Sequence, residues 1–363
     1  MRIIFLSMFV AMSAAAQIWT SYAFSGLSVN RDGTTFLFSS PLRLRGATDQ
    51  GAWEKIFSWT AKDGVRLIAQ RSPESFVRAW RFGWDGVGYY HLITPSISAD
   101  GQTMALTGRS DCTAGAVCAY SRERWETTIR FADCSERRIA GSARLSANGR
   151  YVLTRSSLPL RDATWVDVLT GQSVPFSELV TGGPRPVAND GTTVRRVGQQ
   201  ALELWRPGSN PFQPTEVKSL PGLTSTGAVL LSSDARALVT RIPTGLVRYE
   251  IATSKVNSIS SSPSIEAVDI SEDGTAVLLR ESGVYRVWRS SDSGLRDLLV
   301  SGQITDAVLS GDGSTVFAVV DGSRVVRVDV DRGQVAEVIP RSTYAIAQFN
   351  MSAEPIVGLG SLL

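Results

Sequence analysis

The segment 80–91 contains the densest set of side chains in this chain that could bind a ligand. It reads Trp-Arg-Phe-Gly-Trp-Asp-Gly-Val-Gly-Tyr-Tyr-His, with five aromatic rings and the only histidine. Aromatic rings beside arginine stack on sugars, peptides and planar molecules. The alternative is that the rings only pack this segment against the rest of the fold. As a ligand-binding surface, the segment would offer Trp80, Arg81, Trp84, Asp85, Tyr89, Tyr90 and His91.

His91 limits the catalytic chemistry that this chain can perform. A single histidine excludes zinc sites with two or three imidazoles, including His-Glu-x-x-His. A serine triad would need His91, yet no Gly-x-Ser-x-Gly elbow is present. A hydrolase or lactonase would require His91 and Asp85 to meet further carboxylates, for which Asp269, Asp306 and Glu266 are candidates. The alternative role of those three carboxylates is structural hydrogen bonding near the centre of the fold.

Metal, cofactor and nucleic-acid signals are weak. The segment 329–333, Asp-Val-Asp-Arg-Gly, resembles a calcium loop but lacks the third acidic ligand and the distal glutamate. The segment 358–360, Gly-Leu-Gly, lacks the third glycine of a dinucleotide fingerprint. The net charge of +3 comes without a basic stripe. We expect no cofactor, no metal and no nucleic-acid partner.

The three cysteines lie within one stretch of the chain. Cys112 and Cys118 bracket a short loop and form the predicted disulfide, although Cys134 could compete for either partner. Three thiols without a nearby histidine make a poor zinc site. An oxidising compartment outside the cytoplasm would permit a disulfide.

The first sixteen residues are typical of a signal peptide. Arg2 is followed by a largely apolar run over 3–12 and by alanines at 14–16, which suit signal peptidase. No later apolar run is long enough to span a bilayer. We therefore expect a secreted or periplasmic protein without a transmembrane segment after signal removal. A retained anchor or a buried N-terminal strand is the alternative.

A four-residue turn motif recurs seven times and predicts the architecture. The copies lie at 30–33, 98–101, 146–149, 188–191, 232–235, 271–274 and 310–313, and most read Ser-x-Asp-Gly or a close variant. Their third residues are 68, 48, 42, 44, 39 and 39 residues apart. Hairpins repeating at a period near 40 indicate a β-propeller. Ala235 replaces the glycine in the fifth copy, so we expect a different turn geometry there.

A second signal supports four strands per repeat. An apolar segment with aromatic or branched residues follows each turn motif and runs into a second polar turn, as at 284–288 before Ser293 and Gly294. We predict an all-β propeller of seven four-stranded blades over residues 17–345, with eight blades as the alternative. Residues 346–363 would form a ring-closing strand, a degenerate eighth blade or the start of a truncated C-terminal domain. The segment 18–24 could pair with the last blade.

In these repeats the chain resembles the secreted bacterial WD-repeat-like and TolB-like propellers. The resemblance rests on Ser-x-Asp-Gly before the second strand and on an aromatic third strand ending near Thr-Gly or Ser-Gly, over about 24–340. The Gly-His and Trp-Asp signatures of intracellular WD repeats are missing. The resemblance implies a fold, whereas such repeats serve scaffolds, receptors and enzymes alike.

Three long connections, 40–53, 71–95 and 107–124, should emerge on one face, because blade strands run from the inside outward. We expect this face to bind a protein, peptide or glycan of the cell envelope without catalysis. A hydrolase or lactonase acting in the channel mouth is the alternative. A sensor or structural module of a larger envelope protein is the third hypothesis.

Overall fold

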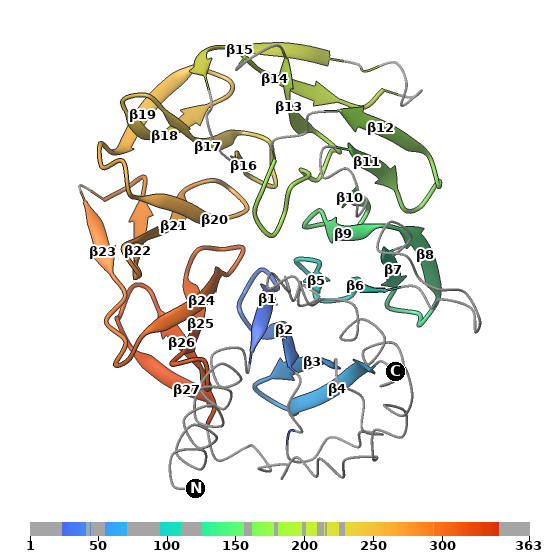
Figure 1. Cartoon of the computed structure of the whole chain (residues 1–363), viewed down its shortest axis with the longest axis vertical. Coiled ribbons are helices and arrows are strands. Elements are labelled where there is room, and N and C mark those ends of the chain that lie inside the picture. Colours follow the sequence, from blue (N-terminus) through green and yellow to red (C-terminus); the bar gives the residue numbers. More distant parts are fainter. Residues whose placement is uncertain are drawn as a thin grey trace, which may run out of the picture.

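The chain folds as a ring of seven twisted antiparallel sheets. The computed structural model describes residues 24–40, 44, 55–70, 95–109, 125–155, 162–177, 181–197, 201–208, 214, 216–224, 229–292 and 294–340. These residues form strands and no helix. Figure 1 shows the sheets arranged radially around one axis. The chain is thus a seven-bladed β-propeller, which confirms the predicted fold class and blade count.

Each sheet is built from consecutive strands, and neighbours pair antiparallel. Blade 1 contains β1 (Ser25–Val29), β2 (Thr35–Ser40), β3 (Lys55–Thr60) and β4 (Gly64–Gln70). Blade 2 contains β5 (Ser96–Ile97), β6 (Met104–Arg109), β7 (Trp125–Arg130) and β8 (Glu136–Ala140). Blade 3 contains β9 (Ser142–Leu145), β10 (Tyr151–Arg155), β11 (Asp162–Asp167) and β12 (Ser173–Ser177).

The remaining blades continue the order around the ring. Blade 4 contains β13 (Thr193–Val197), β14 (Ala201–Arg206) and β15 (Glu216–Thr224). Blade 5 contains β16 (Leu230–Leu231), β17 (Ala237–Ile242), β18 (Gly245–Glu250) and β19 (Lys255–Ser260). Blade 6 contains β20 (Glu266–Ile270), β21 (Ala276–Glu281), β22 (Val284–Arg289) and β23 (Leu295–Asp297). Blade 7 contains β24 (Ile304–Leu309), β25 (Thr315–Val320), β26 (Arg324–Asp329) and β27 (Val335–Ile339).

Blade 4 departs from the pattern at its inner edge. Residues 181–188 precede β13 but form only an isolated bridge, from Thr181 to Val229. This segment contains Pro184 and Pro186, which have no N–H to donate to a ladder. The N–H of Ala188 still donates to the carbonyl of Thr192, so the segment enters the turn as the inner strands do. Blade 4 therefore has three regular strands and an irregular inner segment.

The recurring turn motif works through two side-chain oxygens. In the turn of blade 6, Ser271 Oγ donates to Asp273 Oδ1 at 2.7 Å and accepts the N–H of Ala276 at 2.9 Å. Asp273 Oδ1 also accepts the N–H of Thr275 at 3.0 Å. The same pattern holds in the turns that begin at Ser98, Ser232 and Ser310. The motif thus satisfies the backbone of a tight hairpin with its own side chains.

Ala235 adopts the left-handed conformation that glycine takes in the other copies. Its φ is +56°, against +69° at Gly274 and +73° at Gly313. Ser232 and Asp234 make the same hydrogen bonds as their counterparts in blades 6 and 7. The expectation of a different turn geometry was therefore wrong. The hydrogen bonds of the motif hold the alanine in a conformation that it rarely adopts alone.

The hydrophobic core is divided among the blade interfaces. Seven apolar clusters fill the seven interfaces between neighbouring blades. Every residue of β25 is buried, because Phe317 and Val319 face blade 1 while Val316 and Ala318 face blade 6. A central strand of a blade therefore reads as an unbroken apolar run rather than an alternating one. Stability follows from packing each blade between two others.

Backbone hydrogen bonds join the hairpin turns of blades 1 to 7 into a closed ring. In each junction the donor belongs to one blade and the acceptor to the next, as for Ala99 N to Ala147 O at 2.6 Å and Glu272 N to Gly311 O at 2.7 Å. The ring closes where the N–H of Asp312 in blade 7 donates to the carbonyl of Arg31 in blade 1 at 2.9 Å. At the junction of blades 3 and 4 the acceptor is the Asn189 side chain. The innermost turns therefore form one continuous hydrogen-bonded ring at this end of the propeller.

Candidate functional site: the channel and its two faces

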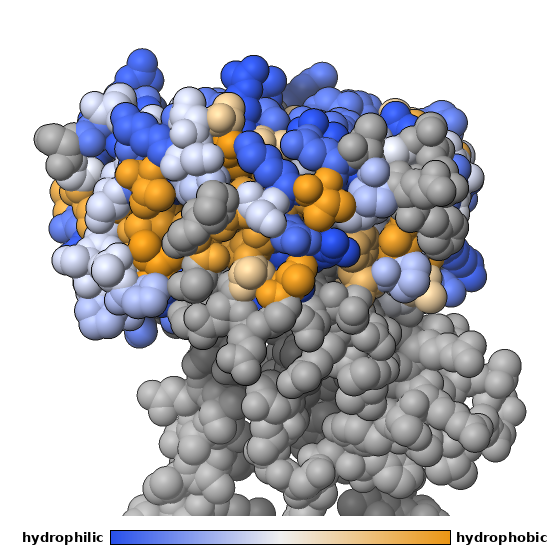
Figure 2. All heavy atoms as spheres, turned by 90° about the horizontal axis from the view of Figure 1, so that it is seen from above, coloured by the Kyte–Doolittle hydropathy of each residue, from blue (hydrophilic) through white to orange (hydrophobic). Residues whose placement is uncertain are grey.

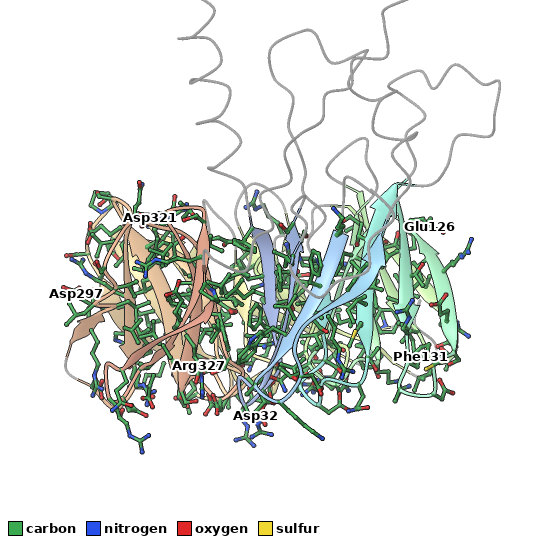
Figure 3. All side chains as sticks on the ribbon, turned by 90° about the horizontal axis from the view of Figure 1, so that it is seen from below. Asp32, Glu126, Phe131, Asp297, Asp321 and Arg327 are labelled. Atoms are coloured by element: carbon green, nitrogen blue, oxygen red, sulfur yellow. The ribbon has the colours of Figure 1, made fainter. Side chains whose placement is uncertain are left out.

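The strand order creates two different faces. We call the side with the turns between first and second strands the turn face; Asp32 and Phe131 lie there in Figure 3. The opposite side, the loop face, carries Glu126 and Asp321. The strand ends that flank 41–54, 71–94 and 110–124 all lie on the loop face, because strands alternate in direction. In blades 5 to 7, short turns connect the second and third strands instead.

The predicted binding and disulfide residues fall outside the described part of the chain. These are Trp80, Arg81, Trp84, Asp85, Tyr89, Tyr90 and His91, together with Cys112 and Cys118. Cys134 is described: it is exposed, carries a free thiol and occupies the turn between β7 and β8 with φ of +64°. The N-terminal segment 1–16 and the segment 346–363 also lie outside the described residues.

Polar side chains on the innermost strands bond to the next blade. Ser28 in blade 1 accepts the N–H of Ile97 in blade 2 at 3.1 Å, and Ser96 accepts the N–H of Leu145 in blade 3 at 3.1 Å. Asp269 occupies the corresponding position in blade 6, two residues before the turn serine. Asp269 likewise accepts a backbone N–H group from the next blade, that of Leu309.

Asp269 is fully committed to backbone hydrogen bonds. Its Oδ2 accepts the N–H of Leu309 in blade 7 at 2.9 Å, and its Oδ1 accepts the N–H of Ile270 at 2.8 Å. Only 1% of its surface is exposed. Burial raises the pKa of this carboxyl to about 6, although the charge of Arg185 opposes the shift. The carboxylate therefore joins two blades and is shielded from solvent.

Asp306 makes the equivalent connection from blade 7 to blade 1. It accepts hydrogen bonds from the backbone of Ala307, Leu27 and Gly26. The pairing of β1 with β2 shifts register between Ser25 and Ser28, which leaves Gly26 and Leu27 outside the ladder. Burial raises the pKa of Asp306. The carboxylate thus supplies acceptors to two N–H groups that a β-bulge has released.

Arg185 spans the channel from blade 4 to blade 1. Its Nη2 donates to the carbonyl of Val29 at 2.7 Å, and the residue is 6% exposed. Blades 4 and 1 are not neighbours in the ring, so this contact passes through the centre (Figure 1). Its Nη1 is buried and has no hydrogen-bond partner among the described residues. The arginine occupies the channel near the turn face.

Glu272 completes the charged group at this end of the channel. Its Oε2 lies 3.7 Å from Nε of Arg31, and a side chain at Gly311 would collide with its Oε1. Glu272 therefore reaches from blade 6 past the turn of blade 7 toward blade 1. Burial raises the pKa of Glu272, while Arg185 and Arg31 act in the opposite direction.

The predicted channel carboxylates do not form an acid and base pair. Asp269 and Asp306 use their oxygens to hold backbone N–H groups, as the structural alternative predicted. Glu266 begins β20 and forms an ion pair with Arg280 at 2.6 Å, with its side chain largely exposed. General acid or base catalysis requires a group that can reach a substrate proton, and Asp269 and Asp306 are engaged elsewhere.

The segment 329–333 forms the turn between β26 and β27. Asp329 Oδ1 accepts the N–H groups of Asp331 and Arg332 at 3.0 and 2.9 Å. Hydrogen bonds from this backbone lower the pKa of Asp329. Asp331 forms an ion pair with Arg289 of blade 6 at 3.1 Å. Both carboxylates of the motif therefore have structural roles.

Among the described residues, the exposed large apolar side chains are spread over several blades. Figure 2 shows the ring edge-on, with apolar residues in small groups between hydrophilic ones. The exposed large apolar side chains among the described residues are Leu169, Val197, Val217, Val256, Val284, Leu299 and Val335. They are distributed over blades 3 to 7, and apolar residues spread in this way are ordinary surface features. In the part of the chain that the structure describes, no helix is long and apolar enough to cross a membrane.

Comparison with solved structures supports the fold. The β-propeller domain of the Trilobed protease from Pyrococcus furiosus, described as having an open velcro topology, superposes with a TM-score of 0.56. The identity is 12%, and the match covers 88% of this chain and 98% of that domain. The β-propeller domain of Myceliophteria thermophila Cps50 (Swd1) matches with a TM-score of 0.42 and 16% identity, over 66% of this chain and 82% of that one.

At 12% identity the first likeness establishes a β-propeller and nothing of its activity. No family model matches this chain, and no curated protein matches it in sequence.

Sequence reasoning did not identify Arg185 and Glu272 as channel residues. Arg185 lies in a proline-rich segment that carries no strand signal, and Glu272 occupies a variable position of the turn motif. One signal was available for Glu272: the second residue of each copy of the motif lies in the hydrogen-bonded ring of inner turns, and only Arg31 and Glu272 carry a charge at that position.

Proposed function

We propose that this chain is a non-catalytic β-propeller that acts outside the cytoplasm and binds a protein, peptide or glycan of the cell envelope through its loop face. The observation that carries the proposal is the asymmetry of the two faces. The strand ends that flank the long connections 41–54, 71–94 and 110–124 all lie on the loop face of blades 1 and 2. The turn face consists of tight turns joined by hydrogen bonds.

The state of the channel favours binding over catalysis. Asp269 and Asp306, which a channel hydrolase would use, are bonded to backbone N–H groups, and Asp269 is also fully buried. Arg185 occupies the channel near the turn face. A ligand would thus be recognised by loops supported on a rigid ring, which is a common arrangement in proteins. The extracytoplasmic location rests on the apolar run 3–12 and the alanines that follow it.

The test is capture of a partner by the purified, immobilised chain from a cell-envelope extract. Deletion of 80–91, or the triple change Trp80→Ala, Trp84→Ala and Tyr90→Ala, should abolish capture while the thermal unfolding midpoint changes little. A matched control changes the exposed rim residues Leu169, Val256 and Leu299 to Ala and should retain capture.

Treatment of the extract separates the partner classes. Prior digestion with a protease removes a protein or peptide partner, whereas a glycan partner survives digestion and is lost after periodate oxidation. Identical capture by the wild-type chain and both loop variants would contradict the proposal.

A further inference from the structure

The junction between blades 7 and 1, which we call the seam, is closed differently from the six other junctions. Elsewhere the chain itself runs from the outer strand of one blade to the inner strand of the next. Blade 1 consists of β1 to β4 and blade 7 of β24 to β27, so within the described residues the two blades exchange no strand. Apolar packing across the seam, such as Phe36 on Phe317 with ring centroids 4.6 Å apart, has counterparts at every other interface.

Polar contacts from three other blades converge on one short segment of blade 1, residues 26–31. From blade 7, Asp306 accepts the N–H groups of Gly26 and Leu27, and the N–H of Asp312 donates to the carbonyl of Arg31. From blade 4, Arg185 donates to the carbonyl of Val29. From blade 6, Glu272 forms an ion pair with Arg31.

The local backbone of β1 is shaped to receive these contacts. Gly26 has φ of +62°. The register shift between Ser25 and Ser28 leaves Gly26 and Leu27 unpaired with β2. A buried N–H group without an acceptor is costly, so the bulge requires a partner from outside its own sheet. Asp306 supplies that partner from the far end of the chain.

We propose that Asp306, Arg185 and Glu272 form a polar latch on residues 26–31 that holds blade 1 in the ring, so that the propeller opens first at the seam when the latch is weakened. This inference concerns the ring itself and is independent of the ligand proposed above. A charged acceptor suits this position because hydrogen bonds to an ionised group are stronger than those between neutral groups.

Two matched substitutions test the latch in the full-length chain. Asp306→Ala and Asp269→Ala each remove a carboxylate that accepts backbone N–H groups at a bulged inner strand, partly buried at Asp306 and buried at Asp269. Asp306 bridges the seam, whereas Asp269 bridges blades 6 and 7, which the chain connects directly. Peptide-resolved amide hydrogen exchange reports where each variant opens.

In Asp306→Ala, amides of β1 should exchange roughly tenfold faster than in the wild type, because two N–H groups lose a charged acceptor. Amides of β9, also an innermost strand, should change much less. In Asp269→Ala the increase should appear at Leu309 and not in β1. Unchanged exchange of β1 in Asp306→Ala, or an equal increase in Asp269→Ala, would overturn the proposal.

A second arm covers the case in which Asp306→Ala does not fold. Arg185→Met removes the contact across the channel and keeps an unbranched apolar side chain. Its control is Arg248→Met, because Arg248 is also buried and also donates to one backbone carbonyl, that of Gly274, at 2.7 Å. Arg185→Met should accelerate exchange in β1, and Arg248→Met should act at the junction of blades 5 and 6. Equal exchange of β1 in Arg185→Met and in the wild type would contradict the latch.

Discussion

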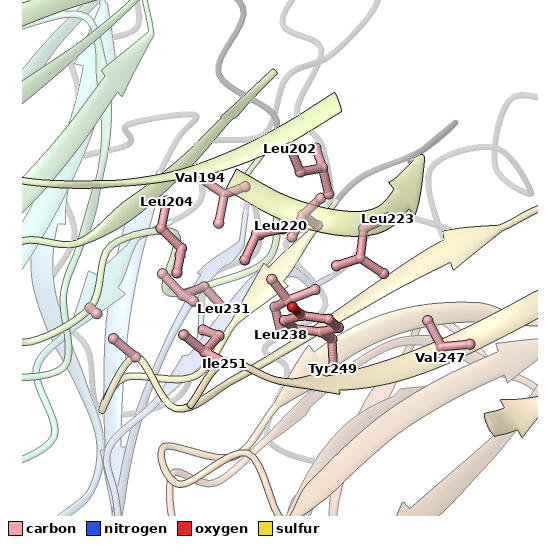
Figure 4. Packing of buried hydrophobic residues seen from close by; sticks show 13 residues of the cluster. Val194, Leu202, Leu204, Leu220, Leu223, Leu231, Leu238, Val247, Tyr249 and Ile251 are labelled. Atoms are coloured by element: carbon pink, nitrogen blue, oxygen red, sulfur yellow. The ribbon is translucent and has the colours of Figure 1, made fainter. Parts of the chain in front are cut away.

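Tyr249 has an unsatisfied hydroxyl at the centre of an apolar cluster. The side chain is fully buried between blades 4 and 5, where Leu220, Leu231 and Leu238 surround it (Figure 4). Its hydroxyl is buried and has no hydrogen-bond partner among the described residues. A polar group in such a place has lost its water without compensation.

Removing this hydroxyl should stabilise the protein. Tyr249→Phe keeps the ring and its packing, so we expect the free energy of unfolding to rise by about 1 kcal/mol. The matched control is Tyr285→Phe, because Tyr285 is equally buried but hydrogen-bonds to Arg280. That control should lose about 1 kcal/mol. Urea unfolding of both variants measures the difference, and equal effects would show that the hydroxyl of Tyr249 has a partner.

At the scale of a structural element, the turn glycines also control the spacing of the blades. A Cβ added at Gly274 would lie 2.6 Å from the Cβ of Ala237 in blade 5, and one at Gly313 would lie 2.8 Å from the Cβ of Ala276 in blade 6. The turn of one blade therefore lies directly on the second strand of the preceding blade. The carbonyls of Gly274 and Gly313 also accept hydrogen bonds from Arg248 and Arg289 of that preceding blade.

Alanine should therefore be much less tolerated at Gly274 than at an isolated left-handed position. Gly333 has a similar φ of +65° with nothing within 4 Å of an added Cβ, so Gly333→Ala should cost roughly 1 kcal/mol of stability. Gly274→Ala adds a collision with a rigid neighbour, and we expect a loss of roughly 2–4 kcal/mol. Thermal and urea unfolding of the two variants compare these effects. Equal losses would mean that the blades separate easily at this contact.

Elements encoded by local residues could be predicted from the sequence. The turn motif predicts its own hydrogen bonds, because Ser and Asp act within five residues of each other. The motif at 310–313 predicts a second strand directly after it, and β25 begins at Thr315. A strand such as β25 is easy to recognise in the sequence, because its apolar run is buried on both faces.

Features that depend on distant residues could not be predicted in the same way. The partner of Arg185 is 156 residues away in sequence, and Asp306 meets β1 only after the ring has closed. The inner segment of blade 4 forms no regular ladder, because Pro184 and Pro186 have no N–H groups to donate. The ligand-binding residues at 80–91 stay a prediction.

At the scale of the whole molecule, the channel carboxylates make stability depend on pH in an unusual direction. Asp269 has a folded-state pKa of about 6 against the ordinary aspartate value of 3.8, and burial also raises the pKa of Glu272 and Asp306. Arg185 and Arg144 lower the pKa of Asp269 without cancelling the effect of burial. The folded state thus binds these protons more tightly than the unfolded state.

The sign of the pH effect follows from this difference. The stability contributed by protonated Asp269 is fully present below the unfolded pKa near 3.8 and is lost as pH rises through about 6. We expect the free energy of unfolding to fall by roughly 2–3 kcal/mol from this group between pH 4 and pH 7. Urea unfolding at a series of pH values measures the slope. In Asp269→Asn, which has no titrating group at this position, the slope should flatten; an unchanged slope would assign it to other groups.

The distribution of the core among blade interfaces has a consequence for how this protein melts. Each blade is held between two neighbours, so losing one would expose apolar surface on both sides of the gap. A linear array of repeats can fray from its ends, but a closed ring has no free terminal repeat. Calorimetry should therefore record one cooperative heat-absorption peak for the ring, with no stepwise release of individual repeats.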